Sequence, residues 1–379
     1  MCGVFGHAAT KVDSFYPMGK QIPRPTFVRR GRANSHEMHQ IVIALKKKNM
    51  KVLESMIIDR ATPGNSMYQE WFTYDEITDI VKNPEATLRV KDWLMENKVE
   101  ITWISEREDY IKAKAPFGSW ENLLNCEFYT FEDTTVTRHA GKNKPHIVHR
   151  ALEYSIPISL KDDIHSVFYT VQTPPRFRPK YRMRDSSVSG ASHGIHPYKS
   201  VFRLQGSLEK EWERKRGSGK MQTKSSGDVT VSFLNEYYQI SSNLGDSRLN
   251  QSVFETGTEY YSTSDLKQFQ ETFGLTVQAA IDVGGNEAST CTDAMSCAEG
   301  NLDIQYIMGV AQKTASVYWY VTDDTDVDPF VLWITELANE RYPPQSNSVS
   351  WGESEYVSQA NTPTLFSYPF IIILSHLML

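Results

Sequence analysis

Apolar residues in the first half of the chain recur at spacings that switch between strand-like and helix-like. Residues 41–45 form an apolar run typical of a buried strand, and apolar side chains between 52 and 57 recur at helical spacing. Thr73-Tyr-Asp-Glu76 is a capping box that predicts a helix reaching Val81. Further helices are predicted at 88–97 and 119–126, and strands at 99–104, 110–115 and 128–131. This mixed order indicates a small α+β domain with an antiparallel sheet.

In the second half of the chain, predicted strands and helices alternate. Helices are predicted at 233–240, 265–273, 298–311 and 328–341, and strands at 276–283, 316–321 and 347–351. The strand at 316–321 belongs to a near-continuous apolar run, as expected of a strand covered on both faces. Regular alternation predicts crossover connections and a parallel sheet, so this half is expected to be an α/β domain. Binding sites form at the carboxyl ends of such strands, where the loop leading to residue 299 is expected to lie.

Composition divides the 379 residues into segments of different character. The expected segments are a proline-containing loose leader at 1–38, a first domain at 39–175, a basic linker at 176–224, part of a second domain at 225–356 and an apolar tail at 357–379. The linker holds 13 basic and 4 acidic residues and is expected to be solvated or cut by processing proteases. The apolar run in the tail is about half the roughly 20 residues that a membrane span needs.

The overall composition is that of a globular protein, with 40% hydrophobic and 23% charged residues. A net charge of -6 argues against a nucleic-acid-binding protein, and no signal peptide is visible at the start. Cys291 and Cys297 are close together with no histidine nearby, which favours a small disulfide loop over a zinc site and leaves free thiols as the alternative. His193 and His196 lack a third ligand in sequence, so no metal site is expected.

The most informative chemistry is a pair of acids, Glu299 and Asp303, four residues apart. On a helix both carboxylates project from one face, with Cβ atoms roughly 6 Å apart. Leu302, Tyr306, Ile307 and Val310 fall on that same apolar side, whereas Asn301 and Gln305 fall on the other. Two buried carboxylates are costly to ionise together, so one pKa should rise and the pair should share a proton, as in a general base. The alternative is that Glu299 caps the first turn and Asp303 pairs with a distant cation.

The run Glu299-Gly-Asn-Leu-Asp303 resembles the Glu-x-x-x-Asp motif of the sedolisins, the serine-carboxyl peptidases. Other stretches resemble parts of the same family in the expected order. Those of the peptidase domain are Val229-Thr-Val-Ser-Phe-Leu-Asn-Glu-Tyr-Tyr238, Tyr260-Tyr-Ser-Thr-Ser-Asp-Leu-Lys-Gln-Phe269 and Ser348-Val-Ser-Trp-Gly352. Those of the activation propeptide are Tyr68-Gln-Glu-Trp-Phe-Thr-Tyr-Asp-Glu76 and Val90-Lys-Asp-Trp-Leu94. The resemblance covers roughly residues 39–356.

This resemblance implies a subtilisin-like parallel-sheet peptidase domain, incomplete here, preceded by an α+β propeptide domain with an antiparallel sheet. Glu299 would be the base that takes the proton of a nucleophilic serine, and Asp303 would orient it. Ser350, Trp351 and Gly352 would line the substrate cleft. The implied partners are a peptide or protein substrate and an intramolecular propeptide–peptidase contact, with no nucleic acid and no membrane span. The implied location is extracellular, lysosomal or vacuolar, and a carboxyl base suits work at acid pH.

The chain also departs from the family pattern. No Ser-Gly-Asp run with the oxyanion aspartate, no Gly-Thr-Ser run with the nucleophile and no calcium site follow Gly352, and residues 357–379 match nothing in the family. We therefore interpret the peptidase domain as C-terminally truncated and expect this polypeptide to be inactive and without a cofactor, calcium being expected only in complete members.

Two other functions compete with this interpretation. The propeptide-like domain could instead bind the cleft of a complete relative, as an inhibitor or folding helper. A glycosidase is disfavoured, because its two acids flank the bond about 5–9 Å apart instead of lying side by side on one helix.

Overall fold

The computed structural model describes residues 14–134, 147–173, 178–179, 229–257, 259–292, 297–322 and 328–352. The predicted tail, the two linker histidines and all of the predicted linker except the backbone of Arg178 and Pro179 lie outside the described residues. In these described ranges, no helix combines the length and the apolar character that crossing a bilayer requires. We call residues 14–173 the N-terminal unit and residues 229–352 the C-terminal unit.

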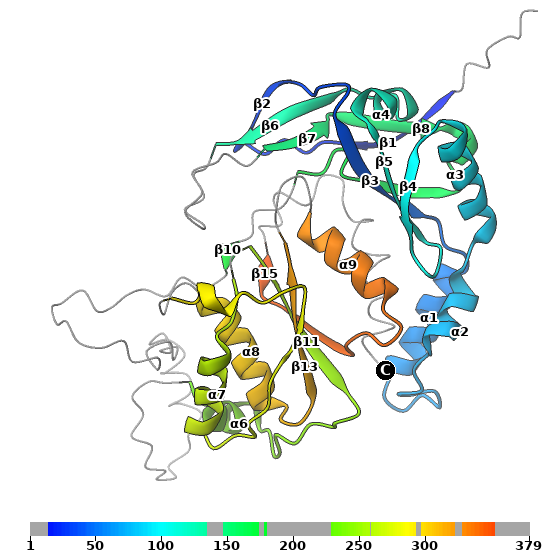
Figure 1. Cartoon of the computed structure of the whole chain (residues 1–379). Helices are drawn as coiled ribbons and strands as arrows, with labels where there is room; N and C mark the ends of the chain where they lie inside the picture. The colour runs from blue at the N-terminus through cyan, green and yellow to red at the C-terminus, as the bar shows by residue number, and fades with distance from the viewer. Residues whose placement is uncertain are drawn as a thin grey trace, which may run out of the picture.

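The N-terminal unit consists of antiparallel sheets and helices, and its first two helices project away from the sheets (Figure 1). Its strands are β1 (Phe15–Lys20), β2 (Phe27–Arg32), β3 (Met38–Leu45), β4 (Glu100–Ile104), β5 (Tyr110–Pro116), β6 (Phe128–Asp133), β7 (Ile147–Ala151), β8 (Glu153–Pro157) and β9 (Ile164–Phe168). Its helices are α1 (Met50–Ala61), α2 (Tyr74–Val81), α3 (Pro84–Glu96), α4 (Phe117–Leu123) and the 3-10 helix η1 (Ile158–Leu160).

Strand β3 is the centre of the largest sheet of this unit, whose order is β4-β5-β3-β9 with every neighbour antiparallel. Its residues Ile41 and Ile43 are fully buried in a core that also contains Trp120 and Phe128. The capping box of α2 is present as predicted, because Thr73 accepts the N–H of Glu76 and the Glu76 carboxylate accepts the N–H of Thr73. The antiparallel α+β prediction is therefore confirmed for this unit.

Residues 15–32, expected to be part of a loose leader, instead form two strands. β1 pairs with β8 and β2 pairs with β6. Prolines are tolerated here because Pro17 lies beside a register shift in a two-stranded sheet, and Pro23 and Pro25 lie in the connection between the strands. The folded N-terminal unit therefore includes residues that we had assigned to the leader.

The C-terminal unit is a parallel sheet with helices on both faces. Its elements are α6 (Val231–Tyr238), β11 (Asn250–Thr256), α7 (Thr263–Thr272), β12 (Ile281–Val283), the 3-10 helix η3 (Ala288–Thr290), α8 (Ala298–Val310), β13 (Ala315–Val321), α9 (Pro329–Asn339), β14 (Ser346–Val349) and β15 (Trp351–Gly352). The strand order β12-β13-β11-β14 is parallel throughout, as predicted. Short β15 pairs antiparallel with β10 (Arg178–Pro179) instead.

Two details of the strand prediction were wrong. The predicted strand at 276–283 is regular only at β12, Ile281–Val283. The central strand β11 was not predicted, although it is buried along almost its whole length. Its only apolar pair is Val253 and Phe254, because several of its buried side chains are polar, and a polar sequence does not produce the continuous apolar run expected of a central parallel strand.

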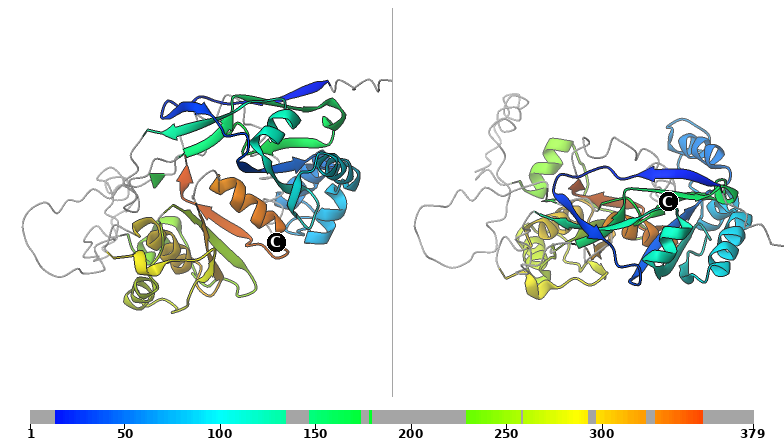
Figure 2. Two further views of the ribbon diagram at one scale, coloured as in Figure 1. Left: turned by 45° about the horizontal axis from the view of Figure 1, so that its top comes forward. Right: turned by 90° about the horizontal axis from the view of Figure 1, so that it is seen from above.

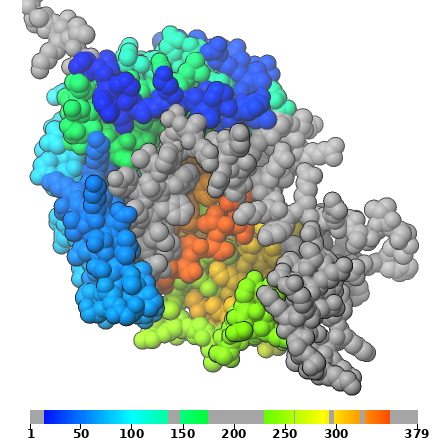
Figure 3. Space-filling view, turned by 180° about the vertical axis from the view of Figure 1, so that it is seen from behind, coloured from blue at the N-terminus to red at the C-terminus, as the bar shows by residue number. Residues whose placement is uncertain are grey.

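Helix α9 lies on the side of the C-terminal unit that faces the N-terminal unit (Figures 1 and 2). On the sheet side, Trp333, Ile334 and Leu337 pack against β11 and β13. On the opposite side, Ala338 and Val331 pack against apolar side chains of the N-terminal unit, namely Val42, Ala44, Trp103, Tyr110, Phe168 and Tyr169. From behind, the orange atoms of the last described elements of the C-terminal unit are visible between two groups of atoms. Blue atoms of the N-terminal unit lie above and to the left, and green and yellow atoms of the earlier part of the C-terminal unit lie below (Figure 3).

Polar contacts at the end of α9 extend this interface. The Glu106 N–H donates to the Asn339 side chain at 2.9 Å, and Arg341 forms an ion pair with Asp75 at 2.5 Å. The ion pair is solvent-exposed on both sides and adds little stability by itself. The apolar contacts of α9 therefore hold the units together, and the polar contacts fix their register.

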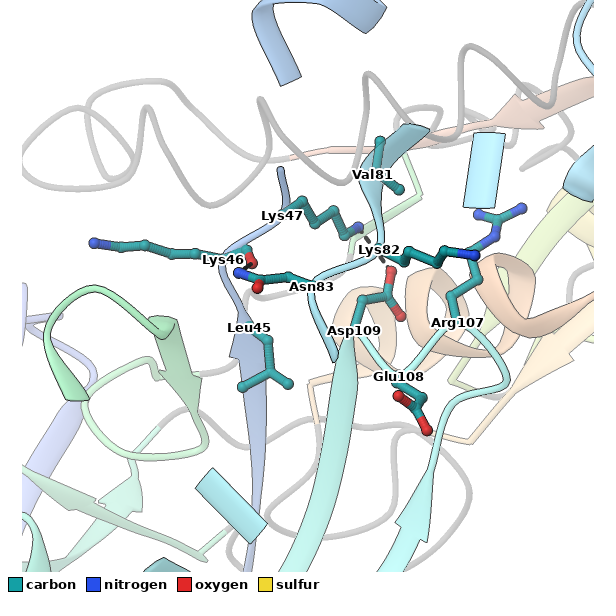
Figure 4. Close-up of a pocket in the computed structure, with 9 residues that line it drawn as sticks. All are labelled: Leu45, Lys46, Lys47, Val81, Lys82, Asn83, Arg107, Glu108 and Asp109. Atoms are coloured by element: carbon teal, nitrogen blue, oxygen red, sulfur yellow. Dashed lines mark hydrogen bonds and ion pairs between the residues drawn. The ribbon is translucent and has the colours of Figure 1, made fainter. Parts of the chain in front are cut away.

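A small pocket of the N-terminal unit contains a buried ion pair (Figure 4). Lys47 contacts Asp109 at 2.8 Å, and both side chains are less than a tenth exposed. Burial opposes ionisation of Asp109, but Lys47 and the Ser105 hydroxyl outweigh it and hold the pKa of Asp109 below its usual value. The other two lysines of the pocket are also engaged, Lys46 with the Lys161 carbonyl and Lys82 with Asp79. The pocket is therefore a structural ion-pair site.

Replacing Lys47 by Met should destabilise the N-terminal unit by about 3–5 kcal/mol, because it leaves Asp109 buried without its cation. Equilibrium urea unfolding measures the loss. The matched control is Lys48→Met, which breaks an ion pair with Glu85 that is about half exposed and should cost under ~1 kcal/mol. Equal losses for the two variants would contradict the assignment.

Candidate active site

Helix α8 carries both acids of the sequence motif and is covered on more than one side. Its most buried line runs through Gly300, Ile304 and Met308. Gln305, expected on the exposed side, is buried, and Tyr306 and Ile307, expected inward, are only partly buried. The expected single apolar stripe was wrong because α6, α7 and the sheet all pack on this helix, so no side of it is fully open.

A third acid, Glu255, meets the motif from the neighbouring strand β11. It is fully buried and accepts a hydrogen bond from the indole N–H of Trp351 at 2.9 Å. Glu255 and Asp303 are hydrogen-bonded to each other, and Asp303 is also hydrogen-bonded to Ser350. A bond between two carboxyl groups requires a proton on one of them, because ionised carboxylates are acceptors only. This contact therefore favours the form in which one of the two carboxyl groups is protonated.

A fourth acid, Glu259, lies in the loop after β11. Its carboxylate accepts the backbone N–H groups of Glu299 and Gly300. The same loop is held by Tyr318, whose hydroxyl donates to the Glu259 carbonyl at 3.2 Å. Neither Glu255 nor Glu259 was identified from the sequence. The available signal for Glu255 was an acid directly after the apolar pair Val253 and Phe254, two residues before Gly257.

Burial raises the pKa of all four carboxyl groups, and the charges of neighbouring acids raise those of Glu255, Glu259 and Glu299 further. Burial, then the charges of Asp303 and Glu259, raises the pKa of Glu299 to about 7. Burial also raises the pKa of Glu259 to about 7, although the two backbone N–H groups oppose this. The pKa of Glu255 lies well above its usual value because of burial and of Asp303 beside it, and burial raises that of Asp303 as well. The cluster therefore keeps protons at pH values where ordinary carboxyl groups have lost them.

One oxygen of each of these four carboxyl groups is buried without a hydrogen-bond partner among the described residues. Such an oxygen favours the protonated form of its own group, because a buried acceptor without a donor is costly. The arrangement can take up, hold and pass on protons. It is suited to general acid–base work.

The structure brings the predicted acids and the predicted cleft residues to one place. Ser350 contacts Asp303, and Trp351, buried apart from 7% of its surface, contacts Glu255. The backbone of Gly352 pairs with Arg178 in the short antiparallel ladder of β10 and β15. Cys291 and Cys297 form a disulfide with a Cα–Cα distance of 5.3 Å, at the start of α8.

Replacing Glu299 by Gln should reduce the pH dependence of the stability of the C-terminal unit. A folded-state pKa raised to about 7 adds stability that is complete below about pH 4.5 and is lost as the pH rises through about 7. In the variant, the difference in unfolding free energy between low and high pH should be smaller by on the order of 2–3 kcal/mol. Urea unfolding at pH 5 and pH 8 gives the comparison, with the exposed Glu271→Gln as control. Equal pH dependence in Glu299→Gln and wild type would contradict the raised pKa.

Comparison with known proteins gives two kinds of match. The family model "Pro-kumamolisin, activation domain" matches residues 25–173. Tripeptidyl-peptidase 1 of Dictyostelium discoideum is 26% identical over 329 residues, which is 83% of this chain and 52% of that protein. The human protein of the same name is 24% identical over 353 residues, covering 89% of this chain and 55% of that protein.

The activation-domain match covers most of the N-terminal unit and includes β2, whereas β1 lies before the matched residues. The similarity to the tripeptidyl-peptidases continues through the C-terminal unit, so the site described above lies within a shared region. The chain spans about half the length of the curated relatives that it matches. The matched activation domain and the similarity to tripeptidyl-peptidase 1 over most of the chain both agree with the resemblance to the sedolisins.

Proposed function

We propose that the C-terminal unit is the first part of a subtilisin-like peptidase domain and carries the acid–base half of its catalytic site. Glu299 would accept the proton of a nucleophilic serine, and Asp303 would orient Glu299 and take part in sharing its proton. The observation that carries this proposal is the buried contact of Glu255, Asp303 and Trp351 beside Glu299. A structural ion pair would instead place a cation beside these acids.

The substrate of this site would be a peptide or protein, bound along Ser350, Trp351 and Gly352. The backbone ladder between β10 and β15 supports this, because an extended peptide adds to a strand edge in the same way. The disulfide supports an oxidising location, extracellular, lysosomal or vacuolar. Calcium would be held only by a complete family member, and no cofactor is proposed for these residues.

The 379-residue polypeptide should show no turnover, because it contains no Gly-Thr-Ser nucleophile or Ser-Gly-Asp oxyanion aspartate after Gly352. An acid-pH assay with a tripeptide-releasing substrate tests this. A chimaera that continues after Gly352 with the C-terminal part of the Dictyostelium relative supplies the missing half. It should turn over at acid pH and lose roughly a thousandfold or more in Glu299→Gln, but not in the exposed Glu271→Gln. Turnover by the polypeptide alone, or a chimaera insensitive to Glu299→Gln, would contradict the proposal.

A second candidate function is binding of a complete relative by the activation domain, as an inhibitor or folding helper. The apolar surface that covers α9 favours it, because Val42, Ala44 and Tyr110 would be exposed without this helix. Such a surface fits the equivalent helix of a related peptidase.

Residues 14–173 should therefore inhibit an intact tripeptidyl-peptidase 1 when added in trans. The fragment must start at residue 14, since β1 and β2 belong to its sheets. Val42→Asp puts a charge into the contact with α9 and should weaken inhibition by about tenfold or more. Lys51→Asp on the exposed side of α1 is the control. Absence of inhibition by the folded wild-type fragment would rule this function out.

A further inference from the structure

We propose that Glu259 is a positioning residue for the candidate base: its carboxylate caps helix α8 from outside the helix and so fixes Glu299 within the acidic cluster. This inference rests on the proposed function of Glu299. It concerns a residue outside the two-acid motif, in the loop that leaves the central strand.

The first turn of α8 has no cap of its own. The N-cap residue is Cys297, whose side chain is joined to Cys291 and makes no capping hydrogen bond. The backbone N–H groups at the second and third helical positions would normally be satisfied by an N-cap side chain. Here those positions are Glu299 and Gly300, and the Glu259 carboxylate accepts both N–H groups. Glu259 therefore does for α8 what an N-cap aspartate does in an ordinary helix.

The capping contact depends on a close approach between the loop and the helix. A Cβ atom on Gly300 would lie 2.4 Å from the Tyr260 carbonyl oxygen and 2.4 Å from the Tyr318 hydroxyl. Only a glycine lets the first turn come this near to the loop. On the next residue, the Asn301 side chain accepts the N–H of Ser262 at 2.8 Å. The loop and the first turn are thus joined on consecutive residues, and Glu259 supplies the charged contact.

The same carboxylate also acts on Glu299 through its charge. A carboxylate at a helix N-terminus is stabilised by the helix dipole, whereas a second carboxylate nearby is made harder to ionise. The groups that face Glu299 in this cluster are Glu259 and Asp303, both acidic. The charges that act on Glu259 itself include Asp303. Glu259 therefore holds the base in place and keeps it protonated to a higher pH.

Three substitutions in the full chain separate these effects. Glu259→Ala removes both the acceptor and the charge, and hydrogen exchange of the amides of residues 298–303 should accelerate by roughly fivefold or more. Glu259→Gln keeps an acceptor oxygen and should leave that exchange nearly unchanged. Glu259→Asp keeps the charge on a shorter side chain and should be intermediate in exchange. Exposed Glu287→Gln is the control and should change nothing.

The second readout is the titration of Glu299 itself. In the chain labelled with ¹³C at glutamate carboxyl carbons, the Glu299 signal is assigned by its loss in Glu299→Gln. Its midpoint should fall in Glu259→Gln, because a neighbouring like charge is gone. A role that is only structural would leave this midpoint where it is.

Unchanged exchange at 298–303 in Glu259→Ala would overturn the capping role, and an unmoved Glu299 midpoint in Glu259→Gln would overturn the influence on the base. Should the Ala variant not fold, the exchange of Glu259→Asp relative to Glu259→Gln decides the first point. Neither measurement requires turnover. The activity assay can therefore contradict the peptidase function while the role of Glu259 is supported. Equally, these two measurements can contradict the role of Glu259 while the peptidase function is supported.

Discussion

Four carboxyl groups brought together away from water cannot all be ionised, and this constraint shapes the C-terminal unit. Glu255, Glu259, Glu299 and Asp303 come from a strand, a loop and a helix, and they meet around the first turn of α8. Without a neighbouring cation, such a cluster is stabilised by protons shared between carboxyl groups and by hydrogen bonds from N–H donors. The structure uses the indole of Trp351 and the backbone of α8 for this purpose.

The surrounding architecture keeps that cluster in place. In the parallel sheet, β11 packs against α8 on one face. On the opposite face, α9 covers the sheet with Trp333, Ile334 and Leu337. The other side of α9 is covered by the activation domain. One helix therefore belongs to the cores on both of its sides, which gives the activation domain a contact with the C-terminal unit that does not involve the acidic cluster.

Much of this arrangement could be predicted from the sequence, for identifiable reasons. The apolar runs at β3 and β13 and the capping box of α2 are local signals, and the structure has all three. The parallel sheet followed from alternation of strands and helices. β11 was missed because Gln251, Ser252, Glu255 and Thr256 are buried polar residues, whose burial is decided by partners distant in sequence. Glu255 and Glu259 were missed for the same reason, since only the fold brings them to α8. The strands β1 and β2 were hidden by prolines that edge positions tolerate.

The central claim is that this cluster holds protons near neutral pH, and infrared spectroscopy of the folded chain tests it most directly. Protonated carboxyl groups absorb separately from carboxylates, so their number can be followed through a pH titration. The account predicts a protonated-carboxyl band that persists to about pH 7, the value to which the pKa of Glu299 is raised, and that is smaller in Glu299→Gln. Complete loss of the band by about pH 6, where ordinary glutamates and aspartates are almost fully ionised, would contradict it.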